Sequence, residues 1–394
     1  MRDVLVAGGG PAGTAAAILL RQRGHDVMLV DEARFPRDKV CGEGISPEAW
    51  RLLRELGADA AVRALAPKAL LGMTLVSPDG TAFTGTYGGT REGFAVRRLA
   101  LDNALLNVAR EAGVDVREGA RACAVLTSRG QVTGLRVQGA GDEEDVPARL
   151  VIAADGRRSL VARRLGLLRE HRRFRKFSVR GHFTGVQGLG DFGEMHVGSG
   201  GYCGIAPLGR AQEANVAFVL PEAEMRAAAG SLPEFYARTL HRWPRVAERL
   251  EGAHLLAPPR AIGPLALVAS AVSAPGAMLV GDAAGFYDPF TGEGVTLALR
   301  SAELAAEVGD RALRADRTGD LRAYDRVRHE ATRDKFRLNR VIQQIVAWPE
   351  LANAVARRLK RRPVLADRLV GIAGDFVPAR TAFDLGFLYD FLTA

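Results

Sequence analysis

A glycine-rich turn between a predicted strand and a predicted helix constrains the fold of this chain most strongly. Residues 4–7 form a short apolar run that is typical of a buried parallel strand, and an alanine- and leucine-rich helix is expected over residues 14–23. Between them, Gly8, Gly10 and Gly13 follow the spacing G-x-G-x-x-G. This spacing is typical of dinucleotide sites, where a tight turn and a helix N-terminus bind a pyrophosphate.

A second predicted strand, residues 27–30, completes the β–α–β unit and ends beside Asp31 and Glu32. A carboxylate at this place, about twenty residues after the glycine turn, can accept hydrogen bonds from ribose hydroxyls. Pro11 and Ala12 lie within the turn and are expected to contact the same cofactor. The unit predicts a dinucleotide site but does not say which dinucleotide is bound.

A second glycine-rich segment identifies the cofactor as FAD. It follows a predicted strand over residues 278–280 and opens a long predicted helix over residues 294–312. A carboxylate at the strand end can hold the flavin polyol, and a glycine-rich helix start can stabilise negative charge on the ring. NAD has no part that needs a second site of this kind. The residues expected to bind FAD here are Gly281, Asp282, Pro289, Gly292 and Gly294.

The remaining pattern predicts an α/β fold in which a Rossmann-like FAD-binding domain with a parallel sheet is interleaved with an antiparallel-sheet substrate domain. Short alternating strands are expected between residues 174 and 220, and the last seventy residues are expected to be helices punctuated by Pro349, Pro363 and Pro378. We expect the FAD-binding domain over residues 1–168 and 262–330, the substrate domain over 169–261, and a C-terminal helical region over 331–394.

Composition excludes several other classes of protein. The three cysteines are far apart and the seven histidines are scattered, so we expect neither a disulfide framework nor a metal site. The net charge is +9, but most basic residues alternate with Asp and Glu, so no nucleic-acid partner is predicted. No apolar run approaches the length of a bilayer span and no signal peptide is recognisable, so we expect a cytoplasmic protein.

Taken together, these segments resemble the FAD-dependent family that joins geranylgeranyl reductases to the p-hydroxybenzoate hydroxylase-like group A flavin monooxygenases. Residues 35–44 are similar to the P-x-x-K-x-C-G-G segment of geranylgeranyl reductases, with Glu43 in place of the middle glycine. Residues 150–158 resemble the D-G motif of the family, and residues 281–294 resemble its G-D motif and flavin-ring loop. The resemblance implies further FAD contacts from Arg37, Cys41, Gly42, Arg98, Asp155 and Gly156.

Cys41 and Glu43 are the candidate catalytic residues. The resemblance places Cys41 near the flavin, although a small buried apolar role is an alternative for any cysteine. Glu43 is a titratable group of the same loop that would steer a proton or bind a polar substrate group, unless it lies on the loop surface.

The segment of residues 202–207 departs from the pattern of the family that the chain resembles. Halogenases carry W-x-W-x-I-P and geranylgeranyl reductases Y-x-W-x-F-P, whereas this chain has Gly204 at the second ring position and Ala206 before Pro207. Tyr202, Gly204 and Pro207 are therefore predicted to bind the substrate in a roomier pocket. This departure disfavours halogenation.

The resemblance leaves two reactions open. The preferred hypothesis is an NAD(P)H-using monooxygenase that hydroxylates a lipophilic aromatic or polyketide-type substrate through a flavin C4a-hydroperoxide. The alternative is saturation of C=C bonds in a prenyl chain. The basic residues 357–362 beside apolar stretches predict either peripheral membrane contact or a helical cap on the substrate domain. The sequence does not indicate the oligomeric state.

Overall fold

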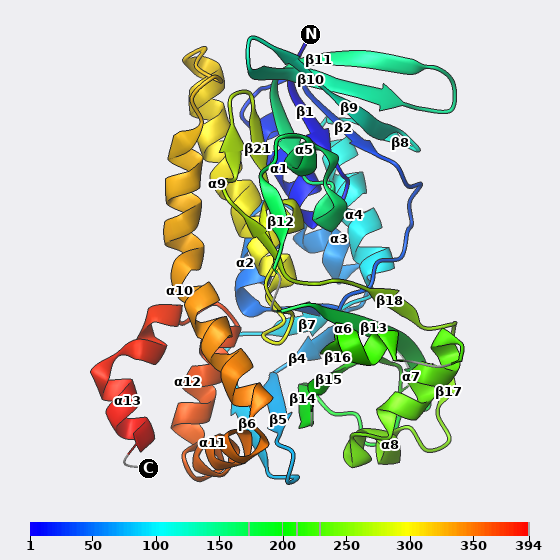
Figure 1. The fold of residues 1–394 in the computed structure, drawn as a ribbon, viewed down its shortest axis with the longest axis vertical. Helices are drawn as coiled ribbons and strands as arrows, with labels where there is room; N and C mark the ends of the chain where they lie inside the picture. Colours follow the sequence, from blue (N-terminus) through cyan, green and yellow to red (C-terminus); the bar gives the residue numbers. More distant parts are fainter. Residues whose placement is uncertain (172–173, 199, 210–211, 228–229, 393–394) are drawn as a thin grey trace.

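The computed structural model describes the chain except for residues 172–173, 199, 210–211, 228–229 and 393–394. Two large sheets follow one another along the molecule, the first near the N-terminus and the second toward the C-terminus (Figure 1). The predicted α/β fold, with a parallel sheet interleaved with an antiparallel one, is confirmed.

The first sheet has the strand order β20-β21-β11-β1-β2-β8, in which β21, β11, β1, β2 and β8 are parallel. A hairpin of two further strands pairs antiparallel with the first half of β11. The strands are β1 (Arg2–Ala7), β2 (Val27–Asp31), β8 (Asp115–Glu118), β9 (Arg121–Ser128), β10 (Gln131–Gln138), β11 (Glu143–Ala153), β20 (Ser273–Ala274) and β21 (Ala277–Leu279). Their parallel order brings the carboxyl ends of β1, β11 and β21 to one edge.

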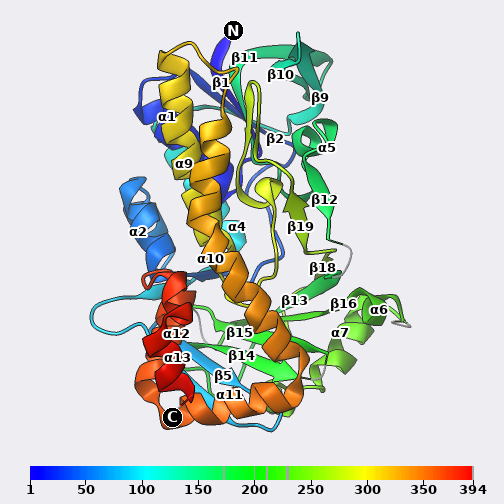
Figure 2. The same ribbon diagram turned by 60° about the vertical axis from the view of Figure 1, so that its left-hand side comes forward.

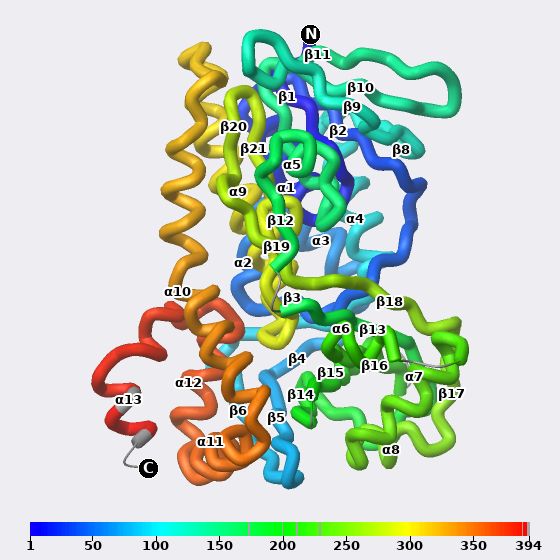
Figure 3. The backbone as a smooth tube through the Cα atoms, viewed as in Figure 1, coloured from blue at the N-terminus to red at the C-terminus, as the bar shows by residue number. Residues whose placement is uncertain are grey.

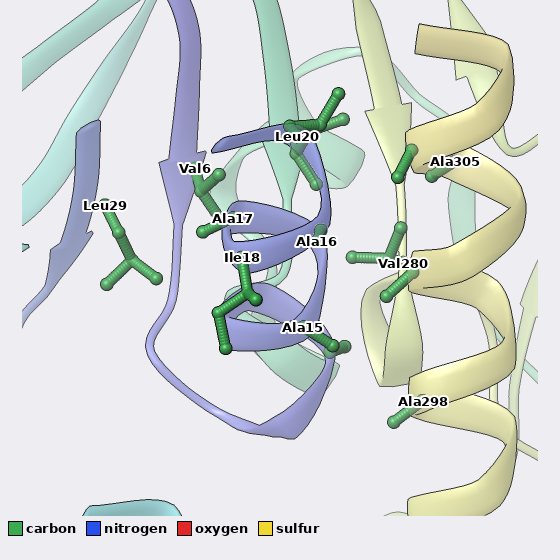
Figure 4. Close-up of a cluster of buried hydrophobic side chains, with 14 of the residues drawn as sticks. Val6, Ala15, Ala16, Ala17, Ile18, Leu20, Leu29, Val280, Ala298 and Ala305 are labelled. Atoms are coloured by element: carbon green, nitrogen blue, oxygen red, sulfur yellow. The ribbon is translucent and has the colours of Figure 1, made fainter. Parts of the chain in front are cut away.

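Small residues let the first helix lie close to this sheet. Helix α1 (Pro11–Gln22) packs against α9 (Gly294–Arg314), and Ala16 and Ile18 are fully buried (Figure 4). The helix begins at Pro11 rather than at the predicted residue 14, because proline suits the first turn of a helix, where its missing N–H would be unpaired. The other helices near this sheet are α2 (Pro47–Glu55), α3 (Asp59–Arg63), α4 (Arg98–Glu111) and α5 (Leu160–Arg164).

The second sheet has the order β17-β13-β16-β15-β14-β5-β6, with β18 beside β13. Its strands are β5 (Gly72–Val76), β6 (Ala82–Thr86), β13 (Lys176–Thr184), β14 (Phe192–Gly198), β15 (Gly201–Pro207), β16 (Ala214–Pro221), β17 (His254–Leu255) and β18 (Arg260–Ile262). Between β16 and β17 the chain forms helices α6 (Glu222–Arg226), α7 (Leu232–Leu240) and α8 (Pro244–Arg249). Strands β5 and β6 come from within residues 1–168, which the sequence assigned to FAD binding. They join this sheet because β5 pairs in parallel with β14, so a boundary at residue 168 does not separate the two sheets.

Smaller elements connect the two sheets. They are the three-stranded sheet of β3 (Gly44–Ile45), β7 (Gly93–Ala95) and β4 (Lys68–Leu70), the pair of β12 (Leu168–Glu170) and β19 (Leu267–Ala269), and the 3-10 turns η1 (Gly156–Arg158) and η2 (Gly281–Ala284).

The C-terminal region is helical, as predicted. Helix α10 (Arg322–Ala347) runs from the first sheet to the second, and α11 (Pro349–Arg361) crosses the far end of the molecule (Figures 2 and 3). The chain then forms α12 (Pro363–Ala373), η3 (Ala379–Phe383) and α13 (Leu385–Leu392). Prolines begin α11 and α12 and precede η3, so the predicted breaks are confirmed. None of the helices that the structure describes is long and apolar enough to cross a membrane.

Candidate active site

A cavity lies between the carboxyl edge of the first sheet and one face of the second. Most residues predicted to bind cofactor or substrate line it. These are Gly10, Pro11, Ala12, Cys41, Gly42, Glu43, Arg98, Gly156, Gly281, Asp282, Pro289, Gly292, Gly294, Tyr202 and Gly204. Segments more than 280 residues apart in the chain therefore meet at one place.

The glycine turn after β1 has two separate roles. Gly8 has a φ of +104°, and a Cβ on Gly13 would lie 1.8 Å from the carbonyl oxygen of Gly8, so the turn itself requires both glycines. A Cβ on Gly10 would meet nothing nearer than Nη2 of Arg37, at 3.6 Å. The cavity therefore has open space at Gly10, beside the N–H groups that begin α1.

Asp31 supports this turn, whereas Glu32 lies away from it. The Asp31 carboxylate accepts hydrogen bonds from the backbone N–H groups of Gly9, at 2.7 Å, and Ala33, at 2.8 Å. Glu32 is exposed, and neither carboxylate lines the cavity in the structure. The predicted ribose contact of Asp31 and Glu32 thus remains a prediction.

Arg157 is a half-buried cation whose place in the cavity fits an anionic ligand. Nε and Nη1 of Arg157 are buried and donate to no acceptor among the residues that the structure describes, although Arg157 lines the cavity. Burial lowers the pKa of Arg157, while attraction by Asp282 opposes this shift. Because an unpaired buried charge is costly, these N–H groups fit the phosphate oxygens of FAD.

Other charged groups surround Arg157. Lys39 Nζ lies 3.5 Å from Oδ2 of Asp282, and both side chains line the cavity. Asp155 binds the backbone N–H of Leu160 at 2.7 Å, and burial raises its pKa. The sequence prediction missed Lys39 and Arg157, although each lies next to a motif that it did identify.

The start of α9 presents backbone to the same cavity. Pro289, Gly292 and Gly294 line it, and a Cβ at Gly292 would find no atom within 4 Å. A helix of this length carries a partial positive charge at its N-terminus. These features fit the electron-rich edge of a flavin ring, as the sequence predicts.

Arg98 is held firmly beside the loop of residues 41–44. Its Nε and Nη2 donate to the two carboxylate oxygens of Asp102 at 2.7 and 2.8 Å. Arg37 donates to Oδ2 of Asp102 at 2.8 Å. Asp102 is fully buried, so it fixes both arginines that were predicted to contact FAD.

Glu43 is not a loop-surface residue but the centre of a buried polar network. Its side chain is 1% exposed, and its φ is +61°. Oε1 accepts from the backbone N–H of Arg98 at 2.9 Å. Oε2 lies 2.7 Å from Nε2 of His182 and 2.9 Å from Nδ2 of Asn215. The carboxylate therefore joins the loop, the start of α4 and two strands of the second sheet.

The partners of His182 fix its tautomer. Nη1 of Arg180 lies 2.8 Å from Nδ1 of His182, and a guanidinium can only donate. Nδ1 is therefore the acceptor, and Nε2 carries the hydrogen that is donated to Glu43. This arrangement gives Glu43 three donors and does not route a proton onward through His182.

Asn215 offers an acceptor to the cavity. Its Nδ2 donates to both Glu43 and the carbonyl oxygen of Cys41, at 2.9 and 2.8 Å, so the orientation of the amide is fixed by two acceptors. Oδ1 is buried and has no hydrogen-bond partner in the described part of the chain, and Asn215 lines the cavity. Cys41 also lines the cavity, and its Sγ accepts from the N–H of Glu43 at 3.3 Å.

Strand β15 forms one wall of the cavity. Tyr202 donates to Oδ1 of Asp288 at 2.5 Å, and burial together with Asp288 raises the pKa of Tyr202. A Cβ on Gly204 would lie 3.5 Å from Cε of Met195, which is ordinary contact. Pro207 follows the lining residues Ile205 and Ala206 but does not itself line the cavity. The predicted substrate contact of Pro207 therefore stays a prediction.

The chain is similar to known proteins over most of its length. The FAD binding domain family matches residues 1–336. Menaquinone reductase of Mycobacterium tuberculosis is 33% identical over 327 residues, covering 78% of this chain and 76% of that protein. Digeranylgeranylglycerophospholipid reductase of Methanosphaerula palustris is 32% identical over 342 residues, covering 82% and 80%.

Among solved structures, CmlS, a flavin-dependent halogenase, matches with a TM-score of 0.77 at 28% identity. The match covers 84% of this chain but only 62% of the halogenase, so the chain spans less than two thirds of that protein. From the family match, the two reductases and the cavity, we conclude that this chain is an FAD-dependent oxidoreductase and belongs to the family of geranylgeranyl reductases and p-hydroxybenzoate hydroxylase-like flavoenzymes.

Proposed function

We propose that the protein uses FAD to reduce a C=C bond in the prenyl chain of a lipid. The observation that carries this proposal is the similarity to two reductases whose names specify different lipids. Menaquinone and digeranylgeranylglycerophospholipid have unrelated head groups, and what they share is a polyprenyl chain. The polyprenyl chain is therefore the part of the lipid on which this protein is proposed to act.

The walls of the cavity support a hydrocarbon substrate. Apolar side chains from the second sheet, from the loop after β18 and from the loop before α9 line it, namely Met73, Met195, Val219, Ile262, Leu265 and Phe290. Contact with such side chains removes the chain of a lipid from water. Asn215 Oδ1 adds one buried acceptor, which suits a hydroxyl or N–H group of a bound molecule.

The protein supplies binding and orientation for this reaction. Arg157, Lys39 and Arg37 hold the pyrophosphate of FAD, and the start of α9 supports the negative edge of the ring. Bound FAD, once reduced, would supply a hydride to one carbon of the C=C bond and a proton to the other, and would return to its oxidised form. The Asp102 carboxylate fixes Arg98, and Glu43 fixes the loop of Cys41, so the walls around the ring are preorganised. NAD(P)H as the source of electrons is part of the proposal.

Hydroxylation is the second candidate, and Gly204 is the observation that favours it. The sequence alone put hydroxylation first, but the two reductase relatives reverse that order. Gly204 lines the cavity and leaves space where the resembling reductases and halogenases carry a ring. That space suits an aromatic substrate.

Product analysis separates the two reactions. The FAD-loaded enzyme would be incubated with NADPH or NADH and either a geranylgeranyl-bearing glycerophospholipid or a prenylated quinone. Mass spectrometry of the lipid should show the gain of two hydrogens in the tail, with or without air. Gain of one oxygen, only in air, would instead establish hydroxylation.

A further inference from the structure

Helix α11 lies across the end of the molecule opposite the N-terminus (Figure 2). Around it, three large apolar side chains are exposed, namely Trp348 at 64%, Leu351 at 45% and Val364 at 78%. Lys360, Arg361 and Arg362 are exposed on the same segment. We call these six residues the α11 face.

Packing within the protein does not account for this face. Helix α11 buries Ala352, Ala356 and Leu359, so the helix already has an apolar side against the rest of the chain. An amphipathic helix needs only that one apolar side to hold its place. The exposed Trp348, Leu351 and Val364 are thus additional, and they lie along one segment together with its exposed basic residues.

The charge of the segment specifies the partner. Residues 348–364 contain five cations and a single carboxylate, Glu350. Nη2 of Arg357 lies 3.5 Å from Oδ2 of Asp79. The consecutive basic residues at the end of the helix, Lys360–Arg362, are exposed to solvent. Apolar side chains beside a basic cluster on a helix are suited to the interface of an anionic bilayer.

We propose that the α11 face docks the protein on an anionic lipid bilayer, with Trp348, Leu351 and Val364 entering the interface and Lys360–Arg362 contacting lipid phosphates. This proposal rests on the proposed function, because a prenylated lipid resides in a bilayer. Trp348 is placed at the start of α11 and Val364 just after its end, so the contact extends over the length of the helix.

Helix α12 connects this surface to the cavity. It starts at Pro363, next to Val364, and ends at Ala373, which lines the cavity. Eleven helical residues span about 16 Å at the usual rise. A docked protein therefore holds its cavity wall about one short helix away from the lipid surface.

Vesicle binding tests the electrostatic part. The full-length FAD-loaded protein should sediment with vesicles of phosphatidylcholine and phosphatidylglycerol, less with pure phosphatidylcholine, and less at high salt. The variant Lys360→Glu/Arg361→Glu/Arg362→Glu should bind on the order of a hundredfold more weakly, since each basic residue contributes roughly fivefold. Arg121→Glu/Arg164→Glu/Arg326→Glu makes the same change of charge at exposed sites elsewhere and should keep binding.

Tryptophan fluorescence tests the apolar part. Trp50 and Trp243 are buried, at 7% and 3% exposure, so Trp348 alone among the three reports on a surface event. Anionic vesicles should shift its emission to shorter wavelength. In Trp348→Phe this shift should disappear while sedimentation largely remains.

Several outcomes would overturn the docking proposal. They are equal loss of binding in the two triple variants, equal binding to neutral and anionic vesicles, and no shift of the Trp348 emission. A change of oligomeric state in the α11 variant without vesicles would assign the face to a second copy of the chain. Turnover of detergent-solubilised lipid is scored separately, so vesicle binding without turnover would refute the proposed function and leave the docking intact.

Discussion

His182 donates a hydrogen bond through Nε2 to the Glu43 carboxylate over 2.7 Å, linking the loop beside the cofactor to a strand 139 residues away. Glu43 also accepts from Asn215 and from the backbone of Arg98. All three partners donate hydrogen bonds. A group that itself donates could therefore replace the carboxylate only with the loss of at least one of these hydrogen bonds.

Glu43→Gln should lower the stability of the protein. The amide has one acceptor oxygen instead of two, and its NH2 would face a donor, which leaves at least one buried group unpaired at a cost of about 1–3 kcal/mol. Thermal unfolding should show a lower midpoint than wild type. Glu32→Gln, on an exposed carboxylate nearby, is the control. Equal midpoints for wild type and Glu43→Gln would contradict the network.

Arg157→Leu should separate cofactor binding from stability. Loss of charge-assisted hydrogen bonds to a phosphate should weaken FAD binding by about 1.5–3 kcal/mol, on the order of ten- to a hundredfold. The apoprotein should be as stable as wild type or more so, because an unpaired buried charge is removed. Arg158→Leu, at the exposed neighbouring position, should change neither quantity. FAD titration by fluorescence and thermal unfolding of the apoprotein measure the two effects, and unaltered FAD affinity in Arg157→Leu would place the pyrophosphate elsewhere.

We predict that the free energy of unfolding depends on pH through the buried carboxyl group of Glu293. Burial raises the pKa of Glu293 to about 7, and the carboxylate shares Lys335 with Asp375, so one ammonium faces two buried carboxyl groups. The folded protein then binds a proton that the unfolded chain releases near pH 4.5. Stability from this group is present at low pH and is lost as the pH rises from about 4.5 through about 7.

Replacement of Glu293 isolates this contribution. The unfolding free energy of Glu293→Gln relative to wild type should increase as the pH rises through this range, because glutamine does not ionise. Glu307→Gln, on the exposed side of the same helix, should show no such trend. Parallel pH profiles for wild type and Glu293→Gln would refute the shift. Urea denaturation at a series of pH values provides the measurement.

Much of the cofactor site was accessible from the sequence because its motifs are local. The glycine turn, the segment at Asp282 and the start of α9 each follow a strand within a few residues, so periodicity and glycine spacing locate them. Arg157 required the structure, because only burial without a partner distinguishes it from its exposed neighbour Arg158.

The contacts missed from the sequence are those between distant segments. His182 and Asn215 belong to strands that reach Glu43 only through the pairing of the second sheet, and no local pattern reports that register. The same holds for β5, whose parallel partner β14 lies more than a hundred residues later.

Gly204 provides a test of the cavity wall. Gly204→Ala should retain activity, because its Cβ would meet Met195 at 3.5 Å, which is ordinary contact. Gly204→Trp should obstruct lipid turnover while FAD binding and the oxidation of NAD(P)H without substrate stay near wild type. Thermal unfolding must accompany the assay, because overpacking destabilises by roughly 1–3 kcal/mol. A stable tryptophan variant with full turnover would remove β15 from the substrate site.

The most direct test of the central claim is anaerobic reoxidation of the reduced, FAD-loaded enzyme, followed by flavin absorbance. The acceptors would be a geranylgeranyl-bearing glycerophospholipid and a menaquinol with an unsaturated tail, whose ring is already reduced. The matched controls are the same lipids with saturated tails. We predict that the yellow absorbance returns only with an unsaturated tail, and that this tail gains two hydrogens. Reoxidation that occurs only when oxygen is admitted, with an oxygen atom in the product, would contradict it.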